Sequence, residues 1–388
     1  MVLEAVPSPD CCREYSDRNM TQPPASTSVT MALKGVINHG VTQTASQPSV
    51  GLQDEVFNAV VRIAAQERLI GALAQSHVSG SLPLLPAQRY QLRNHHTTAQ
   101  AHALALERQL VMISKAYEDA EIDFRVLKGM ALAHLVYPDP SWRTFADVDI
   151  LVPSHQLQAA VAIAMERFGG TQPVPELRPG FAQEFGKESM VRIGRTEIDL
   201  HRTFVAGPFG LSIPLDELFQ DATTIEIGGR QMQALGRHHL FLHACYNVAL
   251  GDHPVRRGSV RDLLLCHKEL DGDLETVITI AKRWGGIAVL QRAGKLALEV
   301  AGIEGARGLE VLAQLAVPRH QAFLMRSYLA PGRSYTRQLA SLAVIPGIGP
   351  RLRYARAMLL PSREYLNSRG WTTRSHVKRA LVRLRHHD

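Results

Sequence analysis

The stretch VLKGMALAHLVYPDPSWRTFADVDILV, residues 126–152, holds the pattern that decides the fold of this chain. The segment IDFRVLKG, residues 122–129, is short and apolar and ends in glycine, which is typical of a strand running into a tight turn. MALAHLVY reads as one or two helical turns, and a proline-containing loop then leads to DVDILV. Acidic and aliphatic residues alternate in DVDILV, and this period of two predicts a second strand.

The sequence that follows extends this unit into a small α/β core. Residues 154–170 have helical spacing and end in a glycine pair. The segment ESMVRIGRTEIDLHRTF predicts two strands joined at Gly194–Arg195, and TTIEIGGRQMQAL predicts a hairpin that turns at Gly228–Gly229. We therefore expect a mixed β-sheet within residues 120–235.

Helical periodicity surrounds this core on both sides. Residues 51–76 and 87–119 have the apolar spacing of helices, and the helical period returns from residue 237 to about residue 345. A chain of 388 residues is also too long for one ordinary domain. The predicted class is α+β: a small mixed sheet over residues 120–235, an N-terminal helical unit over 49–119 and a C-terminal helical bundle over 236–345.

The two ends of the chain differ in composition from the rest. Residues 1–48 are rich in Ser, Thr, Pro and Gln, so we predict a disordered segment that buries too little apolar surface to fold. Residues 346–388 form a basic tail, in which positions 351–388 carry ten Lys and Arg residues against two acidic residues. A basic end can bind nucleic acid or an anionic surface, and it can equally be a solvated helical face.

Overall composition limits the class of protein. Hydrophobic residues make up 45% and charged residues 20% of the chain, which is the balance of a globular protein. No apolar run approaches the roughly 18 residues of a membrane span, and the first residues lack the pattern of a secretory signal. The four cysteines show no CxxC pair and no zinc spacing. We therefore expect a cytoplasmic protein with reduced thiols.

Two aspartates in the second predicted strand are the first candidates for chemistry. Asp147 and Asp149 are two positions apart, so their carboxylates should point to the same face, while Val148 and Ile150 anchor the other face in the core. Their Cα atoms should lie roughly 6.5–7 Å apart, which suits two metal ions about 3.5–4 Å apart. Because a buried acidic pair needs compensation, the pattern predicts Mg²⁺ at this position.

A third carboxylate is available in EIDLH, where Glu197, Asp199 and His201 alternate onto one face of another predicted strand. If that strand lies beside DVDILV, Asp199 completes a three-carboxylate metal site with Asp147 and Asp149. Such a site would bind Mg²⁺ and activate a hydroxyl group for in-line attack on the α-phosphate of a nucleotide. His201 would either contact the substrate or form hydrogen bonds on the inner face of the sheet.

Three further residues are candidates for binding phosphate. Gly129 at the strand-to-helix turn would let backbone N–H groups approach a phosphate at the helix N-terminus. Lys128 beside it would neutralise triphosphate charge, and Arg143 in the loop before the aspartates would clamp a phosphate. A D-x-D pair alone is a weak signal, so the prediction depends on the whole ordered set of residues.

This ordered set resembles an uncharacterised nucleotidyltransferase family of the DNA polymerase β-like nucleotidyltransferase superfamily. The resemblance covers roughly residues 50–368, is strongest over 126–152 and continues in TEIDLHRTF. It implies a nucleotidyltransferase core, two Mg²⁺ ions and a nucleoside triphosphate as co-substrate. It also assigns a phosphate-side turn, a basic residue, a metal-binding pair and a third acid to Lys128–Gly129, Arg143, Asp147–Asp149 and Asp199, respectively.

The predicted function is Mg²⁺-dependent transfer of a nucleoside monophosphate group to a hydroxyl acceptor: a small molecule, a peptide or protein, or RNA. The chain has Lys-Gly where the superfamily usually has Gly-Ser or Gly-Gly. This difference and the basic C-terminus leave an alternative open. The alternative is a non-catalytic nucleotide- or RNA-binding protein that retains the nucleotidyltransferase fold.

Overall fold

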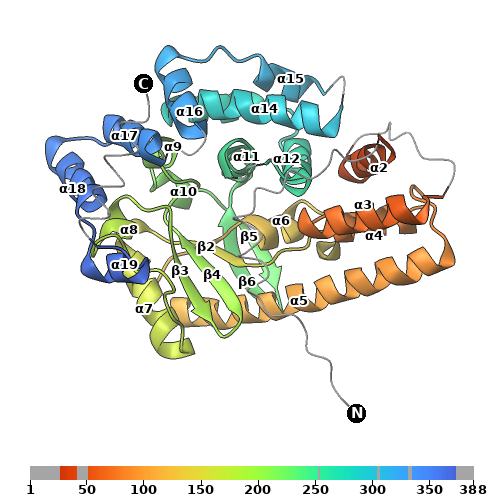
Figure 1. Ribbon diagram of the computed structural model, residues 1–388, viewed down its shortest axis with the longest axis horizontal. Helices are drawn as coiled ribbons and strands as arrows, with labels where there is room; N and C mark the ends of the chain where they lie inside the picture. The colour runs from red at the N-terminus through yellow and green to blue at the C-terminus, as the bar shows by residue number, and fades with distance from the viewer. Residues whose placement is uncertain (1–26, 42–50, 252–253, 304–305, 331–333, 373–388) are drawn as a thin grey trace.

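A single six-stranded sheet lies at the centre of the described part of the chain (Figure 1). The computed structural model describes residues 27–41, 51–251, 254–303, 306–330 and 334–372. The strands are β1 (Arg125–Val126), β2 (Val148–Leu151), β3 (Glu188–Ile193), β4 (Thr196–His201), β5 (Ala222–Ile227) and β6 (Arg230–Leu235). Their order is β3-β4-β2-β1-β6-β5, with β2 parallel to β4, β1 parallel to β6 and the other pairs antiparallel. The predicted mixed sheet and the α+β class are confirmed.

Both predicted hairpins form, because glycines occupy their turns. Gly194 between β3 and β4 has φ 58°, and Gly228 and Gly229 between β5 and β6 have φ 59° and 76°. Left-handed backbone of this kind is accessible to glycine at little steric cost, whereas other residues adopt it rarely. The turns set the registers of the two hairpins, and in the parallel β2–β4 pair Asp149 lies opposite Asp199.

Two hydrophobic clusters pack against the two faces of the sheet. The smaller cluster joins Val148 and Ile150 to α5 (Pro86–Glu118) and α7 (Leu157–Phe168), and the larger cluster takes Leu151. This alternation along β2 follows from the period of two in a strand, as predicted. The larger cluster also joins the helices N-terminal to the sheet with those C-terminal to it. The predicted domain boundaries at residues 119, 235 and 345 stay predictions.

Short helices connect the strands, and longer helices follow them. The connecting elements are α6 (Lys128–Leu135), η1 (Pro140–Trp142), η2 (Ser154–Gln156), α8 (Phe181–Glu184), α9 (Pro208–Leu211) and α10 (Glu217–Gln220). The C-terminal helices are α11 (Arg237–Tyr246), a π-helical turn η3 (Asn247–Gly251), α12 (Arg257–Glu269), α13 (Leu274–Arg283), α14 (Ile287–Ala301), α15 (Arg307–Ala313), α16 (Arg319–Leu329) and α17 (Ser334–Val344). Helices α11 and α12 lie on the face of the sheet opposite α5 (Figure 1).

The N-terminal helices bring one correction. The prediction of disorder over residues 1–48 is wrong for α2 (Thr27–Asn38), while residues 1–26 and 42–48 lie outside the described residues. Apolar side chains of α2 are buried in the larger cluster. The buried guanidinium of Arg261 donates hydrogen bonds to the carbonyls of Val36, Ile37 and His39 at 3.0, 2.8 and 2.8 Å. These bonds satisfy carbonyls that a helix C-terminus leaves unpaired.

The helical unit that follows α2 has a break that matters for the site. Residues 51–76 form two helices, α3 (Asp54–Gln66) and α4 (Ile70–Val78), and the long helix predicted over 87–119 is confirmed as α5. Between α3 and α4, Arg68 adopts a left-handed conformation with φ 63°. This turn directs the chain back toward the sheet and places Arg68 at the central cavity.

The start of the basic C-terminal region is folded onto the core. Helices α18 (Ile348–Leu359) and α19 (Arg363–Ser368) lie near α8, and the backbone N–H of Ser362 donates to Leu177 O at 2.7 Å. The ring of Tyr354 packs against Phe181 and Phe185 at centroid distances of 5.8 and 5.3 Å. Within the described residues, no helix has the length and apolar character that crossing a bilayer requires.

Candidate active site

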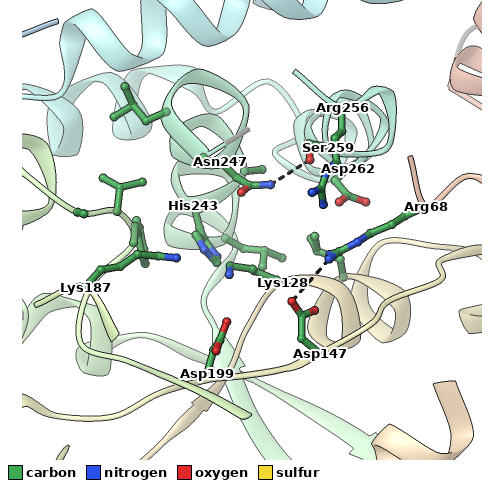
Figure 2. Close-up of a pocket in the computed structure, with 18 of the residues that line it drawn as sticks. Arg68, Lys128, Asp147, Lys187, Asp199, His243, Asn247, Arg256, Ser259 and Asp262 are labelled. Atoms are coloured by element: carbon green, nitrogen blue, oxygen red, sulfur yellow. Dashed lines mark hydrogen bonds and ion pairs between the residues drawn. The ribbon is translucent and has the colours of Figure 1, made fainter. Parts of the chain in front are cut away.

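A polar cavity of about 450 Å³ lies between the sheet and the C-terminal helices (Figure 2). Figure 2 shows Asp147 and Asp199 on one side of it and His243 and Asn247 on the opposite side. Charged side chains from several elements line it: Arg68, Lys128, Arg143, Asp147, Lys187, Asp199, Arg256, Asp262 and Arg337. The cavity is therefore a place where carboxylates and cationic groups face a common space.

The predicted carboxylates meet at the edge of this cavity. Strands β2 and β4 are neighbours, so the condition on which the Asp199 prediction depended is met, and Asp149 lies directly opposite Asp199. Ligand atoms of Asp149, Asp199 and His201 all lie within 4.8 Å of one another. Asp147, which comes just before β2, is not part of that group, and its Oδ2 lies 3.5 Å from Nη2 of Arg68.

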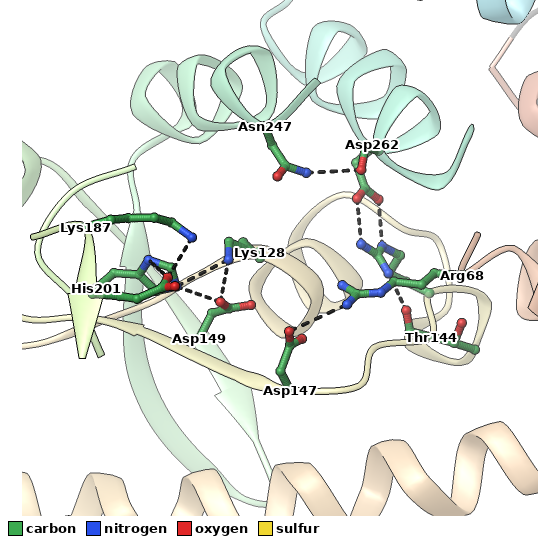
Figure 3. A network of polar contacts seen from close by, with 12 residues as sticks. Arg68, Lys128, Thr144, Asp147, Asp149, Lys187, His201, Asn247 and Asp262 are labelled. Atoms are coloured by element: carbon green, nitrogen blue, oxygen red, sulfur yellow. Dashed lines mark hydrogen bonds and ion pairs between the residues drawn. The ribbon is translucent and has the colours of Figure 1, made fainter. Parts of the chain in front are cut away.

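Lys128 occupies the centre of the carboxylate group (Figure 3). Its Nζ donates to Oδ1 of Asp149 at 2.6 Å and lies 3.3 Å from Nε2 of His201. Burial opposes the charge on Lys128, but the carboxylates of Asp149, Glu188 and Asp147 outweigh it and raise the lysine pKa to about 12. Lys128 is therefore a cation held against Asp149, and its predicted contact with phosphate stays a prediction.

The backbone around Lys128 explains the Lys-Gly pair. Lys128 begins α6 with φ 47°, an unusual conformation for a residue with a side chain. A Cβ atom on Gly129 would lie 2.6 Å from Cβ of Phe145, closer than carbon atoms approach. Glycine at position 129 thus has a packing role beside the loop that carries Arg143, in addition to the predicted approach to phosphate.

His201 lies between two carboxylates beneath the cavity floor. Its Nε2 is 2.7 Å from Oδ1 of Asp149, and its Nδ1 is 3.2 Å from Oε2 of Glu188. The side chain is fully buried, and burial together with the nearby ammonium of Lys128 lowers its pKa. Of the two roles predicted for His201, this position favours hydrogen bonding on the inner face over contact with the substrate.

The two opposed aspartates have contrasting acidities. Burial opposes ionisation of Asp149, but Lys128 and His201 outweigh it and hold the pKa of Asp149 well below its usual range. Burial, with the carboxylates of Glu188 and Asp149, raises the pKa of Asp199 to about 7. Asp149 is thus the stable anion of the pair, and Asp199 is a carboxyl group that can hold or release a proton near neutral pH.

Arg143 is held by Asp262, which Figure 3 shows on the other side of the cavity from His201. Its Nε and Nη2 donate to Oδ1 and Oδ2 of Asp262 at 2.8 and 2.7 Å, and Tyr137 Oη donates to the same Oδ1 at 2.8 Å. Arg143 and Asp262 are both buried. This bidentate pair joins the loop before the aspartates to α12, so Arg143 has a structural partner, and its predicted role as a phosphate clamp stays a prediction.

Sequence reasoning missed several residues at the cavity. Arg68, Lys187 and Arg337 line it from the α3–α4 turn, the position before β3 and α17, and Glu188, which begins β3, lies against His201. Glu188 carried a usable signal, because it begins a predicted strand that is hairpin-paired with EIDLH and lies opposite His201 in register. Arg68 and Arg337 carried no local signal, since only tertiary packing brings them to the cavity.

His243 of α11 lines the cavity. Its ring stacks on Phe204 at a centroid distance of 4.5 Å, and its Nε2 is buried without a hydrogen-bond partner among the described residues. Burial and the nearby cation of Lys128 keep the pKa of His243 well below its ordinary value. The residue is therefore a neutral imidazole with an unused nitrogen beside the cavity.

The donor set at the cavity fits a divalent cation. Oδ1 of Asp147 is buried and has no hydrogen-bond partner among the described residues. Lys128 and His201 both contact Oδ1 of Asp149, so Oδ2 of the same carboxylate is available as a metal ligand. Hard oxygen ligands of this kind are those that Mg²⁺ prefers, and a cation would relieve the repulsion that raises the pKa of Asp199.

A family comparison agrees with this geometry. A family model described as uncharacterised nucleotidyltransferase matches residues 54–302, which is most of the chain. The chain belongs to this family. The resemblance stated from the sequence is confirmed, and with it the class of enzyme, a nucleotidyltransferase. No match was found among curated proteins.

Solved structures are similar to less than half of this nucleotidyltransferase. The solution structure of the antibiotic-resistance factor ANT(2'')-Ia is 16% identical, covers 45% of this chain and 89% of that one, and gives a TM-score of 0.34. Its crystal structure with adenylyl-2''-tobramycin is 19% identical, covers 46% of this chain and 95% of that one, and gives a TM-score of 0.33. The crystal structure of an antigenic nucleotidyltransferase-like protein from Paracoccidioides brasiliensis is 16% identical, covers 48% of this chain and 92% of that one, and gives a TM-score of 0.30. At these TM-scores the likeness does not bear on the acceptor of this chain.

Proposed function

We propose that this nucleotidyltransferase transfers a nucleoside monophosphate group from a nucleoside triphosphate to a hydroxyl acceptor, with release of pyrophosphate and with dependence on Mg²⁺. The observation that carries the proposal is the register of β2 and β4, which sets Asp149 opposite Asp199 at the edge of a cavity with cationic walls. Carboxylates beside cationic groups suit a triphosphate that arrives with divalent cations.

Three carboxylates would hold the metal: Asp147 through its unpaired Oδ1, Asp149 through Oδ2, and Asp199. When bound, Mg²⁺ supplies neutralisation of phosphate charge and lowers the pKa of a hydroxyl group near it. His201 keeps the Asp149 carboxylate in place by its contact with Oδ1, and Oε2 of Glu188 lies 3.2 Å from Nδ1 of the same ring. This support leaves Asp149 fixed in its anionic form.

Asp199 is the residue that we propose to accept the proton of the acceptor hydroxyl group. In the metal-free protein its pKa is raised to about 7, so it is the more basic carboxylate of the opposed pair. Asp149 cannot take this role, because Lys128 and His201 hold it as an anion of low basicity. In this proposal Asp149 supplies a permanent negative charge and Asp199 accepts the proton.

Cationic side chains from separate elements would bind the triphosphate. Lys128 and Arg143 are the two proposed from the sequence, and Arg68, Lys187 and Arg337 are added because they line the same cavity. Arg68 is held by Asp147 at 3.5 Å, a distance typical of a loose ion pair. A phosphate oxygen can compete for such a guanidinium, whereas the bidentate Arg143–Asp262 pair is less free to exchange.

The test is nucleotide binding with and without Mg²⁺. Purified protein is titrated with ATP, GTP, CTP and UTP, and the wild type is compared with the double variant Asp147→Asn/Asp149→Asn. We expect Mg²⁺-dependent binding of at least one nucleotide by the wild type and its loss in the double variant. Glu275→Gln, at an exposed position on α13, is the matched control and should bind like the wild type. Failure of the wild type to bind any nucleotide would refute the proposal.

A second candidate function is nucleotide binding without transfer. The observation that favours it is the contact of Lys128 Nζ with Asp149 at 2.6 Å, because an internal cation then occupies the place where a metal would act. Pyrophosphate release separates the two candidates when binding is established. Release that requires Asp199 supports transfer, and tight binding without release across small-molecule, peptide and RNA acceptors supports the non-catalytic candidate.

A further inference from the structure

Helix α18 has a row of aliphatic side chains on its outer face. Ile348, Leu352 and Leu359 are 78%, 65% and 56% exposed, a large exposure for side chains of this type. At 3.6 residues per turn, all three point within about 40° of one direction. The three residues therefore form one continuous apolar stripe on the helix, which we call the α18 stripe.

The opposite face of α18 is the one that packs on the protein. Tyr354 and Ala357 are buried, and Tyr354 lies against the rings of Phe181 and Phe185. At about 100° per residue, these two positions point away from the α18 stripe. The stripe is thus not an unfinished part of the core: the helix is already anchored by its other face.

Arginine side chains border the stripe on both sides. From the direction of Ile348, Arg351 lies about 60° to one side and Arg356 about 80° to the other, and both are exposed. Helix α18 contains three arginines and no acidic residue. An aliphatic stripe with cationic borders is the pattern of a helix that lies in the surface of a membrane containing anionic lipid.

We propose that α18 docks on an anionic lipid surface, with the α18 stripe inserted among the acyl chains and the bordering arginines on the headgroups. This inference does not depend on the proposed reaction. The charge of the neighbouring sequence complements such a surface, since residues 351–388 carry ten basic and two acidic residues. Each basic residue near an anionic membrane adds to the attraction.

The same charges disfavour the other occupants of the stripe. A second copy of the chain would bring arginines against arginines, and residues 373–388, with five Lys and Arg residues and one acid, would also meet like charge. RNA would use the arginines but would gain nothing from exposed isoleucine and leucine, because its contacts are phosphate charge and aromatic stacking. Of the occupants compared, the lipid surface is the one that uses both the charged and the apolar residues.

The experiment measures co-sedimentation of the full chain with vesicles. Vesicles of phosphatidylcholine with phosphatidylglycerol are compared with vesicles of phosphatidylcholine alone. We expect binding to the anionic vesicles only, weakened by added salt. The stripe variant Ile348→Ser/Leu352→Ser/Leu359→Ser should bind at least about tenfold more weakly. Arg351→Gln/Arg356→Gln should lose about fivefold for each arginine.

Three controls separate the stripe from other causes. Val78, Leu104 and Val311 are 77%, 65% and 50% exposed on other helices, so their triple serine variant should bind vesicles like the wild type. Thermal unfolding should show the stripe variant folded, because its three side chains are exposed. A tail variant, Lys378→Gln/Arg379→Gln/Arg383→Gln/Arg385→Gln, should retain part of the binding.

Three results would overturn the proposal. The first is no binding of the wild type to anionic vesicles, including the case in which a labelled single-stranded RNA binds instead. The second is equal binding by the stripe variant and the wild type, which would assign the interaction to charge alone. The third is complete loss of binding in the tail variant with full binding in the stripe variant.

Discussion

The ammonium group of Lys128 lies 2.6 Å from Oδ1 of Asp149, in the middle of the carboxylates that would bind a metal. Asp149 is buried, so its charge needs a partner inside the protein. Lysine is a compact cation on a flexible stem, and it can leave a carboxylate that a divalent cation approaches. Lys128 therefore links the stability of the metal-free protein to the binding of metal and phosphate.

The first prediction follows from this link. Lys128→Met removes the partner of a buried carboxylate and should destabilise the metal-free protein by about 3 kcal/mol. Mg²⁺ should restore part of the loss, because a cation would take the place of the lysine, so the variant should gain more thermal stability from Mg²⁺ than the wild type does. The measurement is thermal unfolding in chelator and in Mg²⁺. Lys295→Met, at an exposed position, is the control. Equal gains in the two proteins would contradict the prediction.

The second prediction concerns the acidity of Asp199, whose pKa is raised from 3.8 to about 7 by burial and by the carboxylates of Glu188 and Asp149. Between these values the folded protein binds more protons than the unfolded chain, so stability falls as the pH rises through this window. Asp199→Asn has no such proton to lose. In chelator it should therefore be more stable than the wild type at pH 8, with the difference disappearing toward pH 4, and it should lose nucleotidyl transfer.

Thermal unfolding of the wild type and Asp199→Asn across this pH range tests the prediction. Mg²⁺ should reduce the advantage of the variant at pH 8, because a cation stabilises the ionised carboxylate of the wild type. Glu197→Gln is a suitable control, since Glu197 lies on the same strand but pairs with Arg192 outside the carboxylate group. If Asp199→Asn were less stable than the wild type at pH 8 in chelator, ionised Asp199 would not destabilise the folded protein, and the prediction would be contradicted.

The sequence predicted those site residues whose positions follow from the alternation of side chains along a strand. Asp149 and Asp199 follow from alternation along two strands, and Val148 and Ile150 follow from the same period on the opposite face. The neighbouring position of β2 and β4 depends on pairing across the sheet, and the family resemblance, rather than local pattern, supplied it. The burial of His201 between Asp149 and Glu188 depends on both strands and could be stated only as an alternative.

Residues that reach the cavity from other elements could not be predicted locally. Arg68 lies in a left-handed turn between two helices whose apolar pattern runs on without a visible break. The helix α2 was missed because it has 12 residues in a polar segment, and a helix of that length is marginal without tertiary contacts. Those contacts come from the larger cluster and from Arg261, more than 200 residues away along the chain.

The third prediction concerns the buried pair of Arg143 and Asp262. Arg143→Ala or Asp262→Ala alone should cost about 3–5 kcal/mol, because each leaves an uncompensated charge in the protein interior. The double variant should be less destabilised than the sum of the two, with a coupling energy of about 1–3 kcal/mol from urea unfolding. Arg353 and Glu184 form an exposed pair at 2.8 Å, and the same cycle there should give less than about 1 kcal/mol. Coupling no larger than in that exposed pair would contradict the prediction.

The fourth prediction compares two glycines in helices. A Cβ on Gly129 would lie 2.6 Å from Phe145, whereas a Cβ on Gly35 in α2 would meet nothing within 4 Å. Gly129→Ala should therefore cost about 1–3 kcal/mol and should impair nucleotide binding, because Phe145 lies two residues before Asp147 and must move with its loop. Gly35→Ala should instead stabilise the protein by up to about 1 kcal/mol, since alanine is the better helix former. Urea unfolding and nucleotide titration of both variants test this contrast. If both substitutions changed the free energy of unfolding in the same direction, the expected clash between a Cβ at position 129 and Phe145 would be contradicted.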